Sequence, residues 1–172
     1  MNLNVVLFEP EIPANTGNIM RTCMVGNVNL HLIEPLGFYL DEKSLKRAGL
    51  DYMKEFPYKL YNDWLDFENK NPGNYFFITR YGKKTPLQFN WLENKSENIY
   101  LIFGKESSGL PYELLHKNLN SCIRLPMIKD ARSLNLANTV AIMVYHVLGE
   151  FDYPGLAKEE TIKGEDWIYQ EK

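Results

Sequence analysis

The sequence predicts a single α/β domain whose mostly parallel sheet is covered by helices on both faces. Short apolar runs recur along the chain, among them residues 3–8 (LNVVLF) and 99–103 (IYLIF), and they have the length of buried strands. Segments of helical composition, such as residues 112–119, stand between these runs. The connections are short, as is typical of parallel sheets built from alternating strands and helices.

Composition limits the class of protein. A chain of 172 residues with 45% hydrophobic and 13% aromatic content suits one compact domain with a substantial core. Cys23 and Cys122 provide neither a disulfide framework nor metal-ligand spacing, so we expect no metal and a reduced compartment. We find no signal peptide and no membrane-spanning window, and we expect a soluble, cytoplasmic protein. The net charge of −3 excludes a generally basic nucleic-acid coat, so any such site must be local.

The first strand, residues 3–8, leads through a loop into a helix that we expect from Asn15 to Val25, closed by Gly26. Several polar residues share one face of this helix by their spacing: Asn15, Asn18, Thr22 and, at the edge, Arg21. A polar site at a helix start just after a strand and an ordinary solvated helix face explain this pattern equally well.

The second strand is expected over residues 28–33, where a lone strand histidine, His31, is more often a packing residue than a ligand. Asp41 then caps a helix that ends near Gly49. This helix has a basic cluster, usually plain solvated surface but here one of few places for a phosphate to dock: Lys43, Lys46 and Arg47.

Weaker elements fill the middle of the chain. We expect a strand at 56–60, a helical turn at 63–69, a turn at 71–74 and a strand at 75–79. A second basic cluster follows in the loop RYGKKTP: Arg80, Lys83 and Lys84. The segment 87–92 is ambiguous, and a last strand is expected at 121–125.

The strand at residues 99–103 leads into the loop GKESSGLP, which has the outline of a phosphate-binding loop. Leu110-Pro111 stands where that motif requires Lys followed by Ser or Thr, so the phosphate hypothesis fails. Glu106 would also repel a triphosphate, while it suits hydroxyls, an amine or another cationic group. No strand is followed by a G-x-G-x-x-G pattern, which leaves a conventional dinucleotide fold unsupported. Pro111 fits the first turn of the next helix.

The stretch from Arg124 to Gly149 begins as a strand end, passes through a polar loop and becomes a helix that is apolar on every side. Because the segment 139–148 has no water-facing stripe, we expect it to be buried or packed against a partner. Ser133 stands where the N-cap of this helix belongs. A small polar ligand in front of the helix start and a capped core helix with nothing bound both remain open.

Three loops follow strands at the edge where parallel sheets bind ligands: PANTGNIMR, FGKESSGLP and LPMIKDARSLN. The segments NTGNIMR, FGKESSGLP and RLPM…SLNLANTVA, in this order and spacing, resemble the three signature motifs of the SpoU branch of the SPOUT RNA 2′-O-methyltransferases. The opening VVLFEPEIPANTGNIMRTC, together with LHLIEPLGF and KRAGLDY, is most similar to members that methylate the wobble nucleotide of tRNA. The resemblance covers residues 1–156 as one domain and leaves 157–172 as a polar tail, which we expect to be mobile with some anchoring by Trp167 and Tyr169.

The resemblance implies a homodimer whose subunits have a deep trefoil knot at the C-terminal end, where S-adenosylmethionine binds. The apolar helix after Ser133 would then form the knot core and the dimer interface. By position in the motifs, the resemblance implies these cofactor contacts: Ile78, Gly104, Glu106, Leu125, Met127 and Ser133. Further expected neighbours of the cofactor are Gly109, Leu110 and Pro126.

The reaction that the resemblance implies is methyl transfer to a ribose 2′-hydroxyl of the tRNA anticodon stem-loop, with Arg21 as the central residue and Asn15 and Asn135 supporting it. An arginine cannot readily accept a proton, so we expect Arg21 to orient the hydroxyl and stabilise the developing alkoxide while a nearby phosphate receives the proton. Ser108 replaces the Arg that the family often carries, so Lys105 would substitute for that RNA contact. The remaining expected RNA contacts are Lys43, Lys46, Arg47, Arg132 and Tyr145, and Arg80, Lys83, Lys84 and Lys129 would complete the phosphate footprint. Two alternatives stay open: another RNA target, or a non-catalytic RNA-binding module of the same fold.

Overall fold

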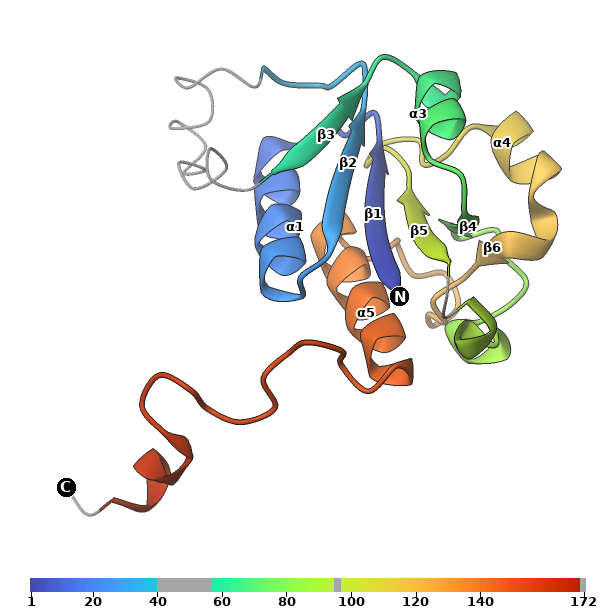
Figure 1. The fold of residues 1–172 in the computed structure, drawn as a ribbon. Coiled ribbons are helices and arrows are strands. Elements are labelled where there is room, and N and C mark those ends of the chain that lie inside the picture. The colour runs from blue at the N-terminus through green and yellow to red at the C-terminus, as the bar shows by residue number, and fades with distance from the viewer. Residues whose placement is uncertain (40–56, 95–96, 171–172) are drawn as a thin grey trace.

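The computed structural model describes residues 1–39, 57–94 and 97–170. Its strands form one sheet in the order β3-β2-β1-β5-β4-β6, and every neighbouring pair is parallel (Figure 1). The α/β class with a mostly parallel sheet is therefore confirmed. The strands are β1 (Asn2–Phe8), β2 (Asn29–Ile33), β3 (Tyr58–Tyr61), β4 (Asn74–Ile78), β5 (Asn98–Phe103) and β6 (Cys122–Ile123).

Helices cover both faces of the sheet, as predicted. Helices α1 and α5 pack side by side on one face, while α3 and α4 lie on the other (Figure 1). The helices are α1 (Pro13–Val25), α3 (Trp64–Lys70), α4 (Tyr112–Lys117) and α5 (Leu136–Glu150). Short 3₁₀ helices complete the described elements: Pro86–Gln88, Trp91–Asn94, Leu119–Ser121 and Glu165–Tyr169.

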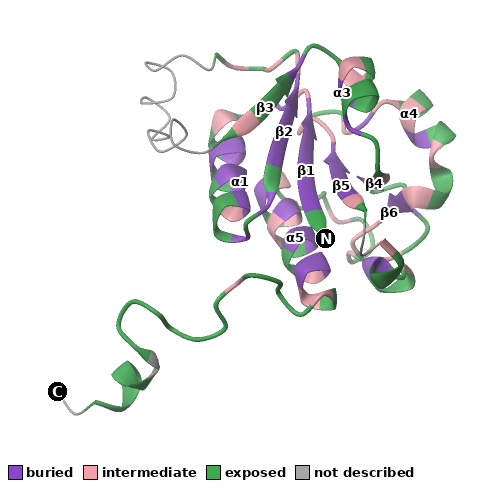
Figure 2. Cartoon of the chain, viewed as in Figure 1, coloured by how far each residue is buried: buried purple, intermediate pink, exposed green. Residues whose placement is uncertain are grey.

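The central strands are largely apolar after their first residues because both of their faces are buried (Figure 2). In β1, Val5 and Leu7 face the core cluster under α1 and α5, whereas Val6 and Phe8 face the cluster under α3 and α4. This alternation explains why the sequence shows continuous apolar runs here instead of an apolar–polar pattern.

Several predicted boundaries change. Helix α1 begins at Pro13, where a proline is tolerated because the first helical N–H has no partner in the helix. Pro111 is the N-cap residue before α4, not a residue of its first turn. Strand β6 spans only 122–123, much shorter than the expected 121–125, because it pairs only with the end of β4. The ambiguous segment 87–92 contains the end of one 3₁₀ helix and the start of another, with residues 89 and 90 between them.

The prediction that Ser133 caps the last helix is wrong. Helix α5 begins at Leu136, and Asn135 is its N-cap: the side-chain oxygen of Asn135 accepts the backbone N–H groups of Ala137 (2.9 Å) and Asn138 (3.3 Å). Ser133 lies two residues too early to reach these N–H groups. It remains in the loop in front of the helix.

Helix α5, expected to be buried or packed against a partner, is buried on one side only. Its residues Val140, Val144 and Val147 are fully buried, but Ile142 and Tyr145 are 46% and 41% exposed on the opposite side. The sequence alone could not distinguish these two sides, since both are largely apolar. The exposed side therefore remains open to a partner.

His31 is a packing residue, as predicted. It is 1% exposed, and its ring nitrogens contact the hydroxyl of Tyr61 at 2.9 Å and the side-chain oxygen of Asn4 at 3.2 Å. Burial lowers the pKa of His31 to about 4. The imidazole is therefore neutral at neutral pH.

Residues 157–169 run away from the domain (Figure 1). Tyr169 is 81% exposed, so it does not anchor this segment, while Trp167 packs under the ammonium group of Lys163, 4.2 Å from its ring. Among the helices described here, none has the length and apolar character required to span a membrane.

Candidate functional site

The three motif-bearing loops converge at the carboxyl edge of the sheet and enclose a cavity of about 610 Å³. Because β1, β4 and β5 are parallel, the loops that follow them leave the sheet at the same edge. The loop before α5 closes the remaining side. The lining comes from four segments: Ile12 and Asn15; Ile78 to Tyr81; Phe103 to Leu110; and Leu125, Met127 and residues 132–136 with Thr139.

The loop after β5 is held tightly closed. Lys105 N–H donates to the carbonyl of Gly109 (3.2 Å), and Gly109 N–H donates to the carbonyl of Lys105 (3.0 Å). Gly109 has φ +72°, a conformation that glycine adopts without strain. A Cβ on Gly104 would lie 2.2 Å from the carbonyl carbon of Gly109, so the loop can close only over a glycine. Backbone groups rather than side chains therefore form this wall of the cavity.

Glu106 joins the loop after β5 to the start of α1. Its carboxylate accepts the backbone N–H groups of Glu11 (2.8 Å) and Ile12 (3.3 Å) and the side-chain amide of Asn15 (3.0 Å). Ile12 offers no side-chain cap to α1, so Glu106 supplies the acceptor from another loop. Although Glu106 lines the cavity, its oxygens are largely committed to the protein. The predicted cofactor contact at Glu106 thus lies in the right place, and its carboxylate holds the site together.

Asn15 links Glu106 to the last helix. Its side-chain oxygen accepts a hydrogen bond from the side-chain amide of Asn135 (2.9 Å), and Asn135 in turn caps α5. A continuous series of hydrogen bonds thus runs from the loop after β5, through α1, to α5. It ties the three predicted motifs together and fixes the orientation of both asparagine amides.

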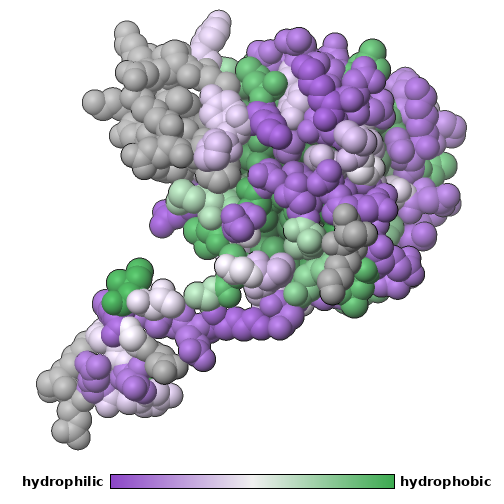
Figure 3. Space-filling view, in the orientation of Figure 1, coloured by the Kyte–Doolittle hydropathy of each residue, from purple (hydrophilic) through white to green (hydrophobic). Residues whose placement is uncertain are grey.

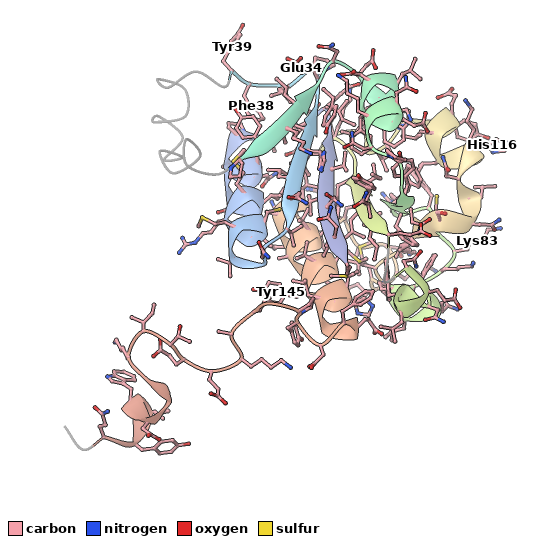
Figure 4. All side chains as sticks on the ribbon, in the orientation of Figure 1. Glu34, Phe38, Tyr39, Lys83, His116 and Tyr145 are labelled. Carbon is pink, nitrogen blue, oxygen red and sulfur yellow. The ribbon has the colours of Figure 1, made fainter. Side chains whose placement is uncertain are left out.

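A second hollow, of about 600 Å³, lies between α1 and α5 next to the first cavity. Asn15 and Asn135 line both spaces, so this pair stands between them. Arg21 from α1 and Tyr145 from α5 both line the second hollow, and Figure 4 shows Tyr145 on α5. The guanidinium of Arg21 forms no hydrogen bond or ion pair with any residue that the structure describes. A polar ligand in this hollow would meet an available cation.

All six residues predicted to contact a cofactor line the first cavity. The predicted neighbours Gly109 and Leu110 line it too, whereas Pro126 is not part of the lining. All three residues predicted to be catalytic line the second hollow. The structure thus brings the two groups together as adjoining sites, while their binding roles stay predictions.

The predicted RNA contacts are more scattered. Arg132 and Lys105 line the first cavity, but the ammonium group of Lys105 forms an ion pair with Glu9. Lys83 belongs to the second basic cluster and lies far from Tyr145, on the side of the molecule that bears His116 (Figure 4). The first basic cluster, Lys43, Lys46 and Arg47, falls outside the described residues.

Sequence reasoning did not single out Glu11, whose carboxylate accepts two hydrogen bonds from Ser107. No local pattern signals this contact, because the two residues are 96 positions apart. Thr79, Arg80 and Tyr81 were also not expected at the cavity. The position of Ile78 at a strand end could have indicated them, since the residues that follow must leave the sheet at the same edge.

The chemistry of the first cavity suits an elongated ligand with both apolar and polar parts. Ile78, Leu110 and Leu125 provide apolar walls for a planar ring. The closed loop after β5 provides backbone groups that can form hydrogen bonds with the edge of that ring. Among the described residues, no group of three or more His, Cys, Asp or Glu side chains is placed to hold a metal ion. The residues present therefore fit an organic cofactor with a nucleoside-like part.

Comparison with known proteins agrees with this geometry. Residues 2–145 match the model of the SpoU rRNA Methylase family. The tRNA (cytidine(34)-2′-O)-methyltransferase of Escherichia coli (strain K12) is 42% identical over 155 residues, which covers 89% of this chain and 96% of that protein. A solved structure described as "Structural insights into the 2-OH methylation of C/U34 on tRNA" has a TM-score of 0.75 and 37% identity, and the match covers 87% of this chain and 96% of the other. An AdoMet-bound rRNA methyltransferase from Sinorhizobium meliloti has a TM-score of 0.71 and 25% identity, over 86% of this chain and 56% of the other.

Proposed function

The chain belongs to the SpoU rRNA methylase family, and from this premise we propose that it methylates the ribose 2′-hydroxyl of nucleotide 34, a cytidine or uridine, in tRNA. The relatives named for this reaction, matched over nearly their whole length, support the substrate. One structural observation carries the proposal: the cavity formed by the second and third motifs adjoins the hollow that contains Arg21, separated from it by Asn15 and Asn135. The protein would act in the cytoplasm, on tRNA.

The methyl donor is S-adenosylmethionine, and the first cavity fits it. Its volume of about 610 Å³ lies within the range of small-molecule sites. Backbone groups of Gly104 and Met127, with the side chains of Ile78 and Leu125, would hold the adenosine part. Ser133 faces the same space from the loop before α5. When bound, S-adenosylmethionine supplies an electrophilic methyl group.

The residues of the second hollow would prepare the nucleophile. A ribose hydroxyl is a poor nucleophile until its proton is removed or strongly polarised. Arg21 remains charged, so its guanidinium would orient the 2′-oxygen and stabilise negative charge that develops there. A phosphate of the substrate would receive the proton. Asn15 and Asn135 hold the boundary between the two sites through their mutual hydrogen bond.

The tRNA would lie over the mouth of the two adjoining sites. Arg132 is exposed beside the first cavity, and Tyr145 is exposed beside Arg21. These residues, together with Lys43, Lys46 and Arg47, would supply the phosphate and ribose contacts. Lys105 would contribute only when it leaves its ion pair with Glu9.

We also infer a deep trefoil knot at the C-terminal end of the domain, and a homodimer that buries the exposed sides of α1 and α5. Residues 1–156 form the proposed domain, because Leu156 is the last residue that packs on the main core. Residues 157–172 form the proposed tail. A chain cut after residue 156 should keep the thermal unfolding midpoint of the full chain, and a clear fall would contradict this boundary.

The decisive experiment measures transfer of labelled methyl from S-adenosylmethionine to unmodified tRNA transcripts. A matched set of transcripts carries 2′-deoxyribose at nucleotide 34 only. We expect transfer to the ribose set and none to the deoxy set. Equal transfer to both sets would place the methyl group elsewhere and reject nucleotide 34, and no transfer to tRNA purified from cells that lack the modification would reject the methyltransferase activity itself.

A further inference from the structure

We infer that Glu11 is a positioning residue that couples the loop after β5 to the helix that bears Arg21. This inference rests on the function proposed above, since it assigns that function a further residue. Glu11 lies in the connection between β1 and α1, two residues before the helix begins. It touches neither of the two hollows, so it would act through other residues.

The carboxylates of Glu11 and Glu106 each accept hydrogen bonds from the loop that carries the other carboxylate. One oxygen of Glu11 accepts the backbone N–H of Ser107 (2.9 Å), and the other accepts the hydroxyl of Ser107 (2.8 Å). In return, the carboxylate of Glu106 accepts the backbone N–H of Glu11 (2.8 Å). An ion pair between Lys105 and Glu9 joins the same two loops. Three consecutive residues of the loop after β5 thus each contact the connection between β1 and α1. We name this set of contacts the loop clasp.

The charge on Glu11 favours the clasp. Hydrogen bonds to an ionised acceptor are shorter and stronger than neutral ones. The bonds from Ser107 also lower the pKa of the Glu11 carboxyl below its ordinary value, so the ionised form is the one that the contact stabilises. Glu11 and Glu106 carry like charges close to each other. The repulsion between the two carboxylates is offset because the oxygens of each accept hydrogen bonds from the opposite loop.

The clasp connects the two halves of the proposed reaction. Residues 104–110 form a wall of the proposed cofactor cavity, and α1 is a rigid rod that extends from Pro13 to Arg21 and beyond. A displacement at the start of this helix therefore moves Arg21 with it. Methyl transfer requires the nucleophile and the methyl group to be held in line, and a misplacement of about 1 Å can cost on the order of 100-fold in rate. The clasp limits that displacement.

The test compares Glu11→Ala, Glu11→Gln and Ser107→Ala with the wild type. We expect kcat for methyl transfer to fall roughly 10-fold in Glu11→Ala, while the Kd for S-adenosylmethionine, measured by calorimetry, changes less than about threefold. Glu11→Gln keeps one acceptor oxygen and should recover part of the loss. Ser107→Ala removes only the hydroxyl bond and leaves the backbone N–H of Ser107 on Glu11, so it should lower kcat less than Glu11→Ala does. Matched controls are Glu113→Gln, at an exposed residue, and Ser121→Ala, at a half-buried one, and both residues lie outside the two hollows.

Amide hydrogen exchange gives a readout that does not need activity. In Glu11→Ala, we expect faster exchange in segments 9–15 and 104–110 and unchanged exchange in β1 and β5. Unchanged exchange in both segments, or faster exchange throughout the sheet, would overturn the inference, as would a kcat within twofold of the wild type. A wild type that does not methylate tRNA at all would instead reject the proposed function, while the exchange experiment would still decide whether the clasp exists.

Discussion

At the scale of single residues, Arg21 combines exposure with the lack of any polar partner in the described part of the chain. A guanidinium that no protein group holds is available to a substrate, and its removal should not disturb the fold. We expect Arg21→Ala and Arg21→Lys each to lower the rate of methyl transfer by about 100-fold or more, because a lysine cannot reproduce the planar fork.

Single-turnover kinetics with saturating S-adenosylmethionine would measure the Arg21 effect, and the thermal unfolding midpoint should stay unchanged. Lys117→Ala, which removes a cation from α4 on the other face of the sheet, is the matched control. Near-normal transfer in either Arg21 variant would contradict the assigned role.

His31 makes stability depend on pH. Its pKa is lowered to about 4 in the folded protein, so the unfolded chain binds a proton more readily below pH 6.5. The free energy of unfolding should therefore fall as the pH drops from 6.5 towards 4, by about 2 kcal/mol between pH 7 and pH 5 from this residue. Denaturant unfolding at both pH values would test it. His31→Gln should lose less stability over this interval than the wild type, and an equal loss would contradict the prediction.

Residues that line the first cavity were easier to predict than residues that hold other residues in place. Ile78, Gly104 and Leu125 stand at strand ends or in motifs, and parallel strands bring their ends to one edge. Glu11 is different, because its role exists only once a loop 96 positions away lies beside it. A sequence pattern cannot contain that information.

At the scale of elements, the N-cap of α5 is Asn135, where the sequence predicted Ser133. We expect Asn135→Ala to destabilise the protein by about 1 kcal/mol, because two backbone N–H groups would lose their acceptor. This corresponds to a fall of roughly 2–4 °C in the thermal unfolding midpoint for a chain of this size. Ser133→Ala is the matched control and should leave the midpoint unchanged. A larger fall in the Ser133 variant would restore the original assignment.

The error at this helix start has a plain physical origin. Serine and asparagine are both strong N-cap residues, and only two positions separate them here. Hydrophobic periodicity cannot choose between the two, because Leu134 and Leu136 flank the boundary with similar character. The hydrogen bond from Asn135 to Asn15 settles the choice, since it fixes the side chain of Asn135 at the point where the helix turns. That partner comes from α1, outside the local sequence.

At the scale of the whole molecule, the layered architecture was predictable because it follows from buried apolar strands and amphipathic helices. The proposed knot is different, since a knot concerns how the chain passes through its own loops, which no hydrophobic pattern encodes. The sequence also could not predict the role of the outer side of α5. An apolar helix side reads the same in sequence whether it faces its own core or a second copy of the chain.

That outer side of α5 provides the last prediction. The adjoining helices α1 and α5 leave four apolar residues exposed, each by 41–57%: Met24, Val25, Ile142 and Tyr145. Figure 3 shows hydrophobic residues gathered over these two helices on one face of the molecule. In the proposed homodimer this surface is buried, and the Arg21 hollow lies next to the interface. An unpaired charge there would lose its hydration without compensation.

We therefore expect Ile142→Glu to weaken self-association by roughly 100-fold or more, and to lower tRNA methylation in parallel as monomers accumulate. Leu65→Glu is the matched control, because Leu65 is 62% exposed on α3, which covers the opposite face of the sheet. Sedimentation velocity over a range of concentrations would measure both variants. A dimer that survives Ile142→Glu would exclude α5 from the interface, and a wild type that stays monomeric throughout the range would remove the homodimer itself. If the dimer dissociates while methylation continues at full rate, each subunit holds a complete site, and the surface serves assembly alone.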